Sequence, residues 1–167
     1  METLSRARKT VLAIAEKLAW LPPALARLLL GVVFISSGWG KLHNLDTVTQ
    51  FFTQLHLPAP GFTAVFVAAN ELVCGALILI GLLTRLAVIP LIVTMIVAII
   101  TVKMEDMSGL KDLLRVEEFH YIVFFIWLAI AGAGALSVDQ LVARKMERDQ
   151  VPGFAPVSGP AGSERRA

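Results

Sequence analysis

One acidic residue, Glu71, lies in the middle of a long apolar stretch, residues 62–82. About nine residues, or ~14 Å of helix, separate it from the beginning of that stretch. A carboxylate at such a depth in a bilayer costs about 2.5–3.5 kcal/mol, so it must be protonated, paired or in contact with water. Asn70 precedes it, and Cys74 follows at i+3 on nearly the same helix face. We interpret Glu71, with Asn70 beside it, as a candidate carboxyl for proton transfer or for hydrogen bonding to a quinone or another lipid-soluble molecule.

Two cations in the preceding apolar stretch could balance the charge of such a site. Arg27 lies near the beginning of residues 24–42, and Lys41 lies near their end. We expect both side chains to extend toward the nearest membrane interface. A purely structural alternative stays open, in which Glu71 pairs with Arg27 or with the hydroxyls of Ser36 and Ser37 and fixes the helix register.

Other chemistry has little support in the sequence. Glu117 and His120 have the i, i+3 spacing of some metal ligands, but the pattern occurs once and at a span end, so we predict no metal site. Cys74 is the only cysteine, which excludes an intramolecular disulfide and a CxxC redox pair. We expect it to be a packing residue. Motifs for phosphate binding, serine hydrolysis and covalent haem attachment are absent from the sequence.

The composition identifies the elements that must hold these residues. The chain has 167 residues, of which 56% are hydrophobic and 17% are charged, whereas soluble globular chains average about 25% charged residues. Four apolar stretches approach the ~20 residues that cross a bilayer, which leaves no room for a second, soluble catalytic domain. We predict an all-α, integral membrane four-helix bundle over residues 24–138, with spans at about 24–42, 62–82, 86–102 and 119–138.

The segments that flank the predicted bundle differ in character. Residues 1–23 carry apolar side chains with helical spacing, which is typical of an amphipathic helix in the membrane interface. Residues 48–55 have a similar spacing and predict a short surface helix. We expect residues 139–167 to form a basic, mostly disordered tail, because Pro, Gly and Ser are frequent from residue 151 on.

The distribution of basic residues predicts the orientation. The side that would hold both termini carries 11 of the 15 Lys and Arg residues, so we predict that both termini are cytoplasmic. Juxtamembrane basic residues also explain the net charge of +2, and we predict the lipid bilayer, and no nucleic acid, as a partner.

Several segments, in this order along the chain, resemble the DoxX family of small bacterial membrane proteins. They are residues 27–31 (RLLLG), 37–42 (SGWGKL), 57–60 (LPAP), 71–77 (ELVCGAL) and 80–85 (IGLLTR). The resemblance extends over about residues 24–136. It implies a multi-pass protein of the bacterial cytoplasmic membrane. Some members of that family are subunits of a thiosulfate:quinone oxidoreductase, and others resemble anchors for enzymes of thiol and oxidative-stress chemistry.

The resemblance and the buried carboxyl together predict a membrane component of a redox system. Quinone is the cofactor that this hypothesis implies, with Glu71, Asn70, Arg27 and Lys41 around it. A soluble redox enzyme and further copies of the chain are the expected protein partners. A non-enzymatic scaffold that docks partners through residues 103–118 and 144–148 is the main alternative, and a small proton-coupled transporter is a third. The residues alone do not distinguish an enzyme subunit from an anchor.

Overall fold

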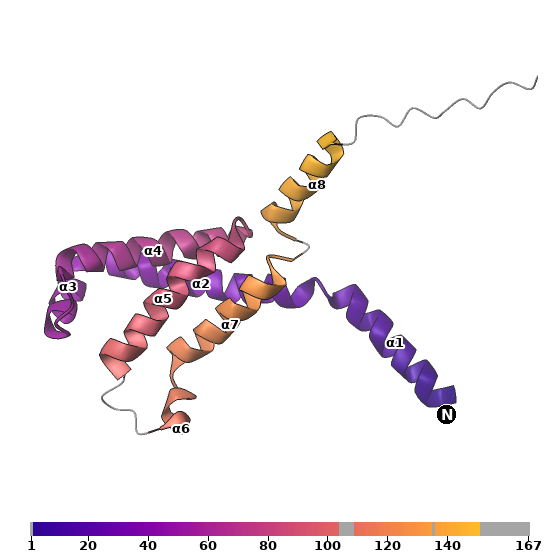
Figure 1. Cartoon of the computed structure of the whole chain (residues 1–167), viewed down its shortest axis with the longest axis horizontal. Coiled ribbons are helices and arrows are strands. Elements are labelled where there is room, and N and C mark those ends of the chain that lie inside the picture. The colour runs from indigo at the N-terminus through magenta and orange to yellow at the C-terminus, as the bar shows by residue number, and fades with distance from the viewer. Residues whose placement is uncertain (1, 104–108, 135, 151–167) are drawn as a thin grey trace, which may run out of the picture.

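A computed structural model describes residues 2–103, 109–134 and 136–150, and every regular element in this part of the chain is helical (Figure 1). In chain order the elements are α1 (Glu2–Leu18), α2 (Leu21–His43), α3 (Leu45–Gln54), α4 (Pro60–Ile80), α5 (Thr84–Ala98), a π-helical turn η1 (Ile99–Lys103), α6 (Leu110–Leu113), α7 (Glu117–Ala131) and α8 (Val138–Gln150). The predicted all-α bundle is therefore confirmed.

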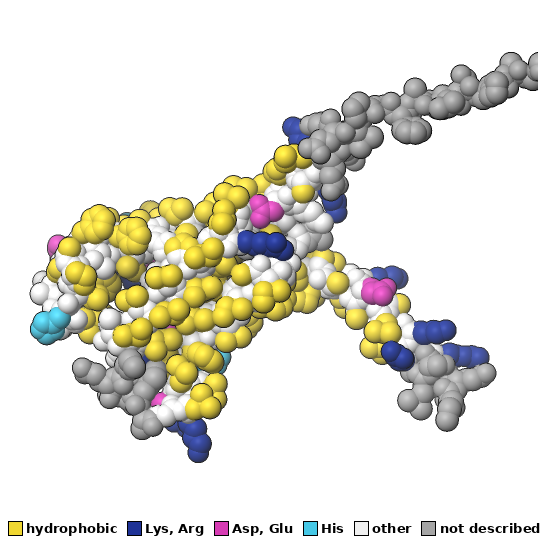
Figure 2. Space-filling view, viewed as in Figure 1, with side chains coloured by type: hydrophobic (Ala, Val, Ile, Leu, Met, Phe, Trp, Pro, Cys, Tyr) yellow, Lys and Arg dark blue, Asp and Glu magenta, His cyan; other side chains and the backbone are white. Residues whose placement is uncertain are grey.

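Three of the helical segments described are long and apolar enough to cross a membrane. They are α2, α4 and the continuous helix of α5 with η1, Thr84–Lys103. The fourth predicted span corresponds to α7, which has 15 residues and ends at Ala131, short of the predicted end at residue 138. Gly132 and Gly134 both have positive φ angles, so the α-helix cannot continue through them. On the face shown in Figure 2, hydrophobic side chains cover most of the bundle.

The closest packing in the bundle is between α2 and α4, which lie side by side in Figure 1. A Cβ atom placed on Gly38 would lie 2.5 Å from the backbone nitrogen of Leu72. A Cβ atom on Gly75 would lie 2.9 Å from the backbone nitrogen of Ile35. Small residues let two helix backbones approach in this way within a membrane, where burial from water cannot drive association.

The remaining helices complete the core. A tight turn that contains Gly81, at φ +72°, reverses the chain between α4 and α5, so these helices are the antiparallel neighbours that their short connection predicts. α5 packs against α7. The ring of Phe34 on α2 contacts the rings of Tyr121 and Phe125 on α7, with centroids 5.3 and 5.1 Å apart. Aromatic rings thus join α2 to α7, whereas glycines form the contact between α2 and α4.

Two helices outside the bundle, α1 and α8, leave it in different directions (Figure 1). The amphipathic segment predicted at the N-terminus is a helix, α1, and the predicted short surface helix is α3. Residues 138–150 differ from the expectation of a mostly disordered tail, because they form α8. The hydroxyl of Ser137 caps this helix by accepting the backbone N–H of Gln140 at 3.2 Å. Residues 151–167 of the predicted tail lie outside the described residues.

Candidate functional site

Glu71 lies in the interior of α4, and its side chain is paired. Its exposed fraction is 1%, and both carboxylate oxygens lie 2.5 Å from the Nζ atom of Lys41 on α2. Lys41 also donates to the hydroxyl of Ser37, one turn earlier on α2, at 3.2 Å. Glu71 is therefore charge-balanced by Lys41, and Ser37 is connected to the pair through the lysine.

The direction of Lys41 differs from the sequence prediction. The sequence predicts a side chain that extends toward the interface, and instead it points to α4. The reason is the close approach at Gly38, one turn before Lys41, which brings the α2 backbone against residues 68–72 of α4. Lys41 keeps 30% of its side chain exposed, whereas Glu71 is almost fully enclosed. The ion pair is consequently closed on the Glu71 side and open on the Lys41 side.

Asn70 belongs to a different set of contacts, which joins α4 to α5. Its amide nitrogen donates to the hydroxyl of Thr94 at 3.1 Å, and its amide oxygen accepts from the thiol of Cys74 at 3.2 Å. Thr94 in turn donates to the carbonyl of Pro90 at 2.9 Å. Sequence reasoning missed Thr94, although its i+4 spacing from Pro90 in an apolar helix is a usable signal. Cys74 is buried, as expected of a packing residue.

Arg27 lies far from the ion pair. It precedes Lys41 by 14 residues on α2, which corresponds to ~21 Å along a helix. Its exposed fraction is 4%, and its Nη2 atom donates to the carbonyl of Leu136, in the segment between α7 and α8. The structure therefore brings Lys41, and not Arg27, to Glu71, and Arg27 does not extend into solvent at the interface.

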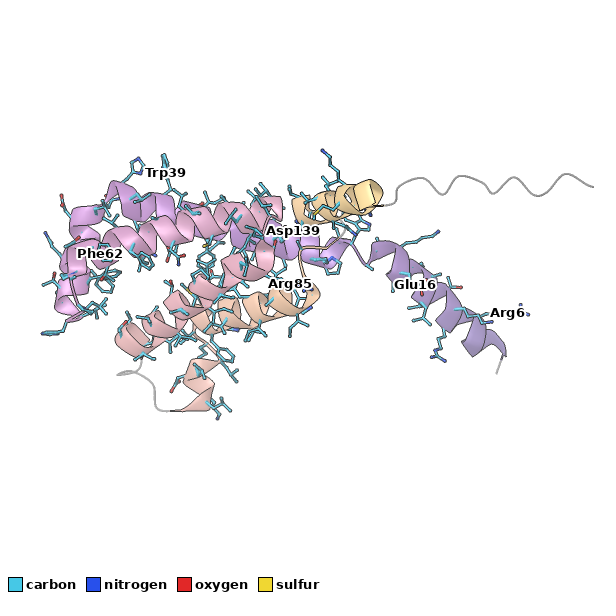
Figure 3. The ribbon with its side chains drawn as sticks, turned by 45° about the horizontal axis from the view of Figure 1, so that its top comes forward. Arg6, Glu16, Trp39, Phe62, Arg85 and Asp139 are labelled. Carbon is cyan, nitrogen blue, oxygen red and sulfur yellow. The ribbon has the colours of Figure 1, made fainter. Side chains whose placement is uncertain are left out.

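The Arg27 end of the bundle has its own polar cluster, centred on Asp139. The Asp139 carboxylate accepts the backbone N–H groups of Leu83 at 2.8 Å and Thr84 at 3.3 Å, and its own N–H donates to the carbonyl of Gly81 at 3.0 Å. Figure 3 shows Asp139 and Arg85 at this end of the bundle and Trp39 and Phe62 at the other. The beginning of α2, the α4–α5 turn and the beginning of α8 therefore meet at one end.

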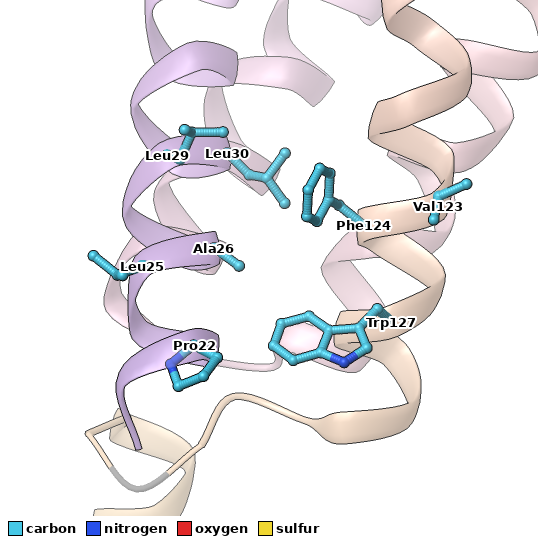
Figure 4. A pocket seen from close by; sticks show the side chains of 8 residues that line it. All are labelled: Pro22, Leu25, Ala26, Leu29, Leu30, Val123, Phe124 and Trp127. Carbon is cyan, nitrogen blue, oxygen red and sulfur yellow. The ribbon is translucent and has the colours of Figure 1, made fainter. Parts of the chain in front are cut away.

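An apolar groove between α2 and α7, with a volume of about 580 Å³, also lies toward this end (Figure 4). Its lining residues, all apolar, are Pro22, Leu25, Ala26, Leu29, Leu30, Val123, Phe124 and Trp127. It does not include the ion pair. Among the described residues, no group of three or more His, Cys, Asp or Glu side chains could hold a metal ion.

Comparison with known proteins establishes the family. A family model described as DoxX matches residues 23–104, from the beginning of α2 through η1, which includes Lys41 and Glu71. A Bacillus subtilis protein named "Putative oxidoreductase CatD" is 33% identical over 129 residues, which cover 76% of this chain and 91% of that protein. This chain belongs to the DoxX family.

Two further relatives of this DoxX protein are named as membrane proteins. The membrane protein Rv3486 of Mycobacterium tuberculosis, named as uncharacterized, is 32% identical over 74% of this chain and 84% of its own length. The inner membrane protein YqjF of Escherichia coli is 29% identical over 72% of this chain and 91% of its own length. No solved structure gave a significant match. The DoxX protein is therefore a membrane protein with transmembrane helices.

Proposed function

We propose that this DoxX protein is the membrane component of a redox system in the bacterial cytoplasmic membrane. It would act either as a subunit of a quinone-linked oxidoreductase or as an anchor for enzymes of thiol and oxidative-stress chemistry. The oxidoreductase name of the Bacillus subtilis relative and the membrane names of the other relatives support this placement.

The observation that carries the proposal is the ion pair between Glu71 and Lys41. A carboxylate with an exposed fraction of 1% in the middle of an apolar helix costs free energy of insertion into the membrane. Such residues are therefore rare, and those that occur are usually paired and functional. Here the partner is a lysine that is still 30% exposed, so the pair can be reached from the Lys41 side. Such an arrangement is typical of sites that hold or transfer a proton.

The donor set at the pair fits a quinone ring. A quinone takes up two electrons and two protons when it is reduced to the quinol. The Lys41 ammonium and the Ser37 hydroxyl are both able to donate a hydrogen bond to a carbonyl oxygen, and they already lie 3.2 Å apart. The Glu71 carboxylate can accept a proton or hold the ammonium in place. We therefore assign Glu71 and Lys41 to the site, with Asn70 positioning α4 against α5, and we leave Arg27 outside it.

We further propose that both termini face the cytoplasm. The end of the bundle where Arg27, Gly81 and Asp139 meet is also the end from which α1 and α8 leave. Two helices that leave the same end require an even number of passes, which supports α7 as a fourth crossing. The excess of Lys and Arg on that side favours the cytoplasm.

A scaffold is the second candidate function, and the two projecting helices favour it. α1 and α8 extend away from the bundle, and charged side chains lie beside exposed hydrophobic ones on both helices (Figure 2). Under this hypothesis the ion pair only holds α2 against α4. Soluble partners then dock on residues 144–148, which belong to α8, and on residues 103–118, of which 104–108 lie outside the described residues.

The decisive experiment measures bound quinone. The protein would be purified in mild detergent from a quinone-containing membrane, extracted with solvent, and assayed for quinone per chain. We expect near-stoichiometric quinone in the wild type and a loss of most of it in Glu71→Gln and in Lys41→Met. The matched control is Glu117→Gln, which removes an exposed carboxylate at the beginning of α7.

Two outcomes would count against the redox proposal. Absence of quinone from folded wild-type protein would favour the scaffold function. Equal quinone content in the wild type and in both pair variants would move the binding site away from the ion pair.

A further inference from the structure

The groove between α2 and α7 is large enough for part of a small molecule and has a purely apolar lining. Its volume of about 580 Å³ lies within the usual range of ligand sites. Leu30 on α2 and Phe124 on α7 point toward each other across it, and the ring of Trp127 points toward Pro22 (Figure 4). Among the described residues that line it, none carries a charge. The groove therefore fits a hydrocarbon chain better than a polar ring or a charged headgroup.

One row of side chains on α2 joins this groove to the ion pair. Successive members of the row are three or four positions apart, which places them on one helix face; they are Ala26, Leu30, Val33, Ser37 and Lys41. The first two line the groove, and the last two are joined by their hydrogen bond of 3.2 Å. Val33, between them, is half-buried. The groove and the ion pair are therefore the two ends of one continuous face of α2.

The length of this row restricts what can occupy both ends. Ser37 lies seven residues from Leu30, or ~10 Å along a helix, and eleven residues from Ala26, or ~16 Å. A ring that binds at Ser37 reaches the groove only through an apolar tail of at least that length. The quinones of a membrane pool have this shape, since a polar ring carries a long isoprenoid tail.

We propose that the groove between α2 and α7 binds the isoprenoid tail of a quinone whose ring binds at Lys41 and Ser37. The tail runs along Val33 and ends between Leu30 and the aromatic side chains of α7. This inference rests on the proposed redox function and deepens it, because it makes a long-tailed membrane quinone, rather than a short-tailed or water-soluble one, the substrate of the site.

The tail has an advantage over the acyl chains of the surrounding lipid. Lipid chains are as apolar as the groove, so burial from water favours neither occupant. A tail that is tethered to a bound ring is, however, present at the groove at a high effective concentration. A phospholipid would also bring its phosphate to the Arg27 end of α2, where the guanidinium is 4% exposed, donates to the carbonyl of Leu136 and does not line the groove.

The test uses the full chain in phosphatidylcholine nanodiscs and a long-tailed quinone with a photoreactive diazirine in the middle of its tail. After irradiation, mass spectrometry of peptides locates the labelled residues. We expect label on α7 at Phe124 and Trp127, and we expect excess duroquinone, which has a ring but no tail, to suppress it. Phosphatidylcholine with the same diazirine on an acyl chain is the reference probe for ordinary lipid contacts.

Variants of the groove separate the tail from the ring. Ala26→Phe fills the groove and should weaken binding of the long-tailed quinone about tenfold while binding of duroquinone stays unchanged. Trp127→Ala removes one wall at a side chain that is 38% exposed, and it should also lower the labelling of α7. The control is Val93→Phe, at a residue of α5 that is 55% exposed and lies outside the groove; it should change neither affinity.

The possible failures are distinguishable. If duroquinone still competes but the label falls on α4 or α5, or persists on α7 in Ala26→Phe, the tail site is wrong and the redox proposal stands. If the phosphatidylcholine probe labels the groove equally with and without quinone, the groove holds ordinary lipid, which also overturns the tail site. If neither the long-tailed quinone nor duroquinone binds the folded protein, the quinone function is wrong and the tail site falls with it.

Discussion

Gly38 on α2 meets the backbone of Leu72 on α4 so closely that a Cβ atom on the glycine would lie 2.5 Å from the Leu72 nitrogen. Leu72 directly follows Glu71, and Lys41 lies one turn beyond Gly38. The contact between these two backbones therefore sets the distance over which the lysine reaches the carboxylate. A residue with no side chain controls the geometry of the only charged contact in the interior of the α2–α4 pair that the structure describes.

Gly38→Ala should destabilise the bundle. The added methyl group would clash with backbone atoms of Ala68 and Leu72, which cannot rotate away, and such overpacking costs about 1–3 kcal/mol. The expected result is a melting temperature in detergent lower by roughly 2–10 °C. Gly40→Ala is the matched control, because no atom lies within 4 Å of the position that its methyl group would take. Equal melting temperatures for the two variants would show that the helices do not pack as described.

Lys41→Met should cost more stability than Glu71→Gln. Removal of the lysine leaves a carboxylate with an exposed fraction of 1% without its cation, and an unpaired buried charge costs about 3–5 kcal/mol in soluble proteins. Removal of the carboxylate leaves a lysine that is 30% exposed and lies two residues before the end of α2, so its long side chain can extend to the membrane interface.

The double variant completes this comparison. Lys41→Met with Glu71→Gln should recover much of the stability that Lys41→Met loses, because no charge is then left unpaired. Chemical unfolding of all four proteins in the same detergent would measure the coupling. Additive losses in the double variant would contradict the ion pair.

Thr94→Val should weaken the contact between α4 and α5. The substitution keeps the shape of the side chain but removes the acceptor of the Asn70 amide, and such bonds in membrane proteins contribute about 0.6–1.7 kcal/mol. Thr101→Val is the control, since the Thr101 hydroxyl likewise donates to the carbonyl four residues earlier, that of Val97, within its own helix. Thermal unfolding should therefore separate the two variants, and a larger loss in Thr101→Val would refute the assigned role of Thr94.

Gly81→Ala should disturb the end of the bundle that holds Arg27. Gly81 has a φ angle of +72°, which costs a residue with a side chain about 1–2 kcal/mol, and its Cβ would clash with the Arg27 guanidinium and with Ser137. Gly61→Ala, in the first turn of α4, has space for the methyl group and serves as the control. Melting temperatures would show the difference. A neutral Gly81→Ala would mean that Arg27 lies elsewhere.

Asp139→Ala should release α8 from the bundle. The variant loses the acceptor for the N–H groups of Leu83 and Thr84, and hydrogen bonds to a charged group contribute about 1.5–3 kcal/mol. We expect amide hydrogen exchange at the α4–α5 turn and in α8 to rise by roughly tenfold or more. Asp46→Ala removes an exposed carboxylate on α3 and should leave these amides unchanged. Unaltered exchange in Asp139→Ala would show that the hydrogen bonds of Asp139 to the α4–α5 turn do little to hold α8 in place.

Most of the membrane-spanning helices could be predicted from the sequence, because a span is recognised by the length and the hydropathy of a local stretch of residues. The three spans α2, α4 and α5 with η1 overlap the predicted stretches closely. The fourth helix ends earlier than predicted, since hydropathy does not register that Gly132 and Gly134 adopt positive φ angles. The prediction misses α8 for a related reason. This helix is held by the cap from Ser137 and by the hydrogen bonds of the Asp139 carboxylate to the α4–α5 turn, which lies more than 50 residues earlier in the chain.

In the candidate site, too, one part could be predicted from the sequence and another part depends on the tertiary structure. Its most informative residue, Glu71, is evident from the sequence alone, because a carboxylate in an apolar span is conspicuous wherever the helices pack. Its partner is not, since the choice between Lys41, Arg27 and the serines depends on the rotation and depth of α2 against α4. Only the tertiary structure decided that choice, through the glycine contact at Gly38, which turns Lys41 inward and leaves Arg27 at the opposite end.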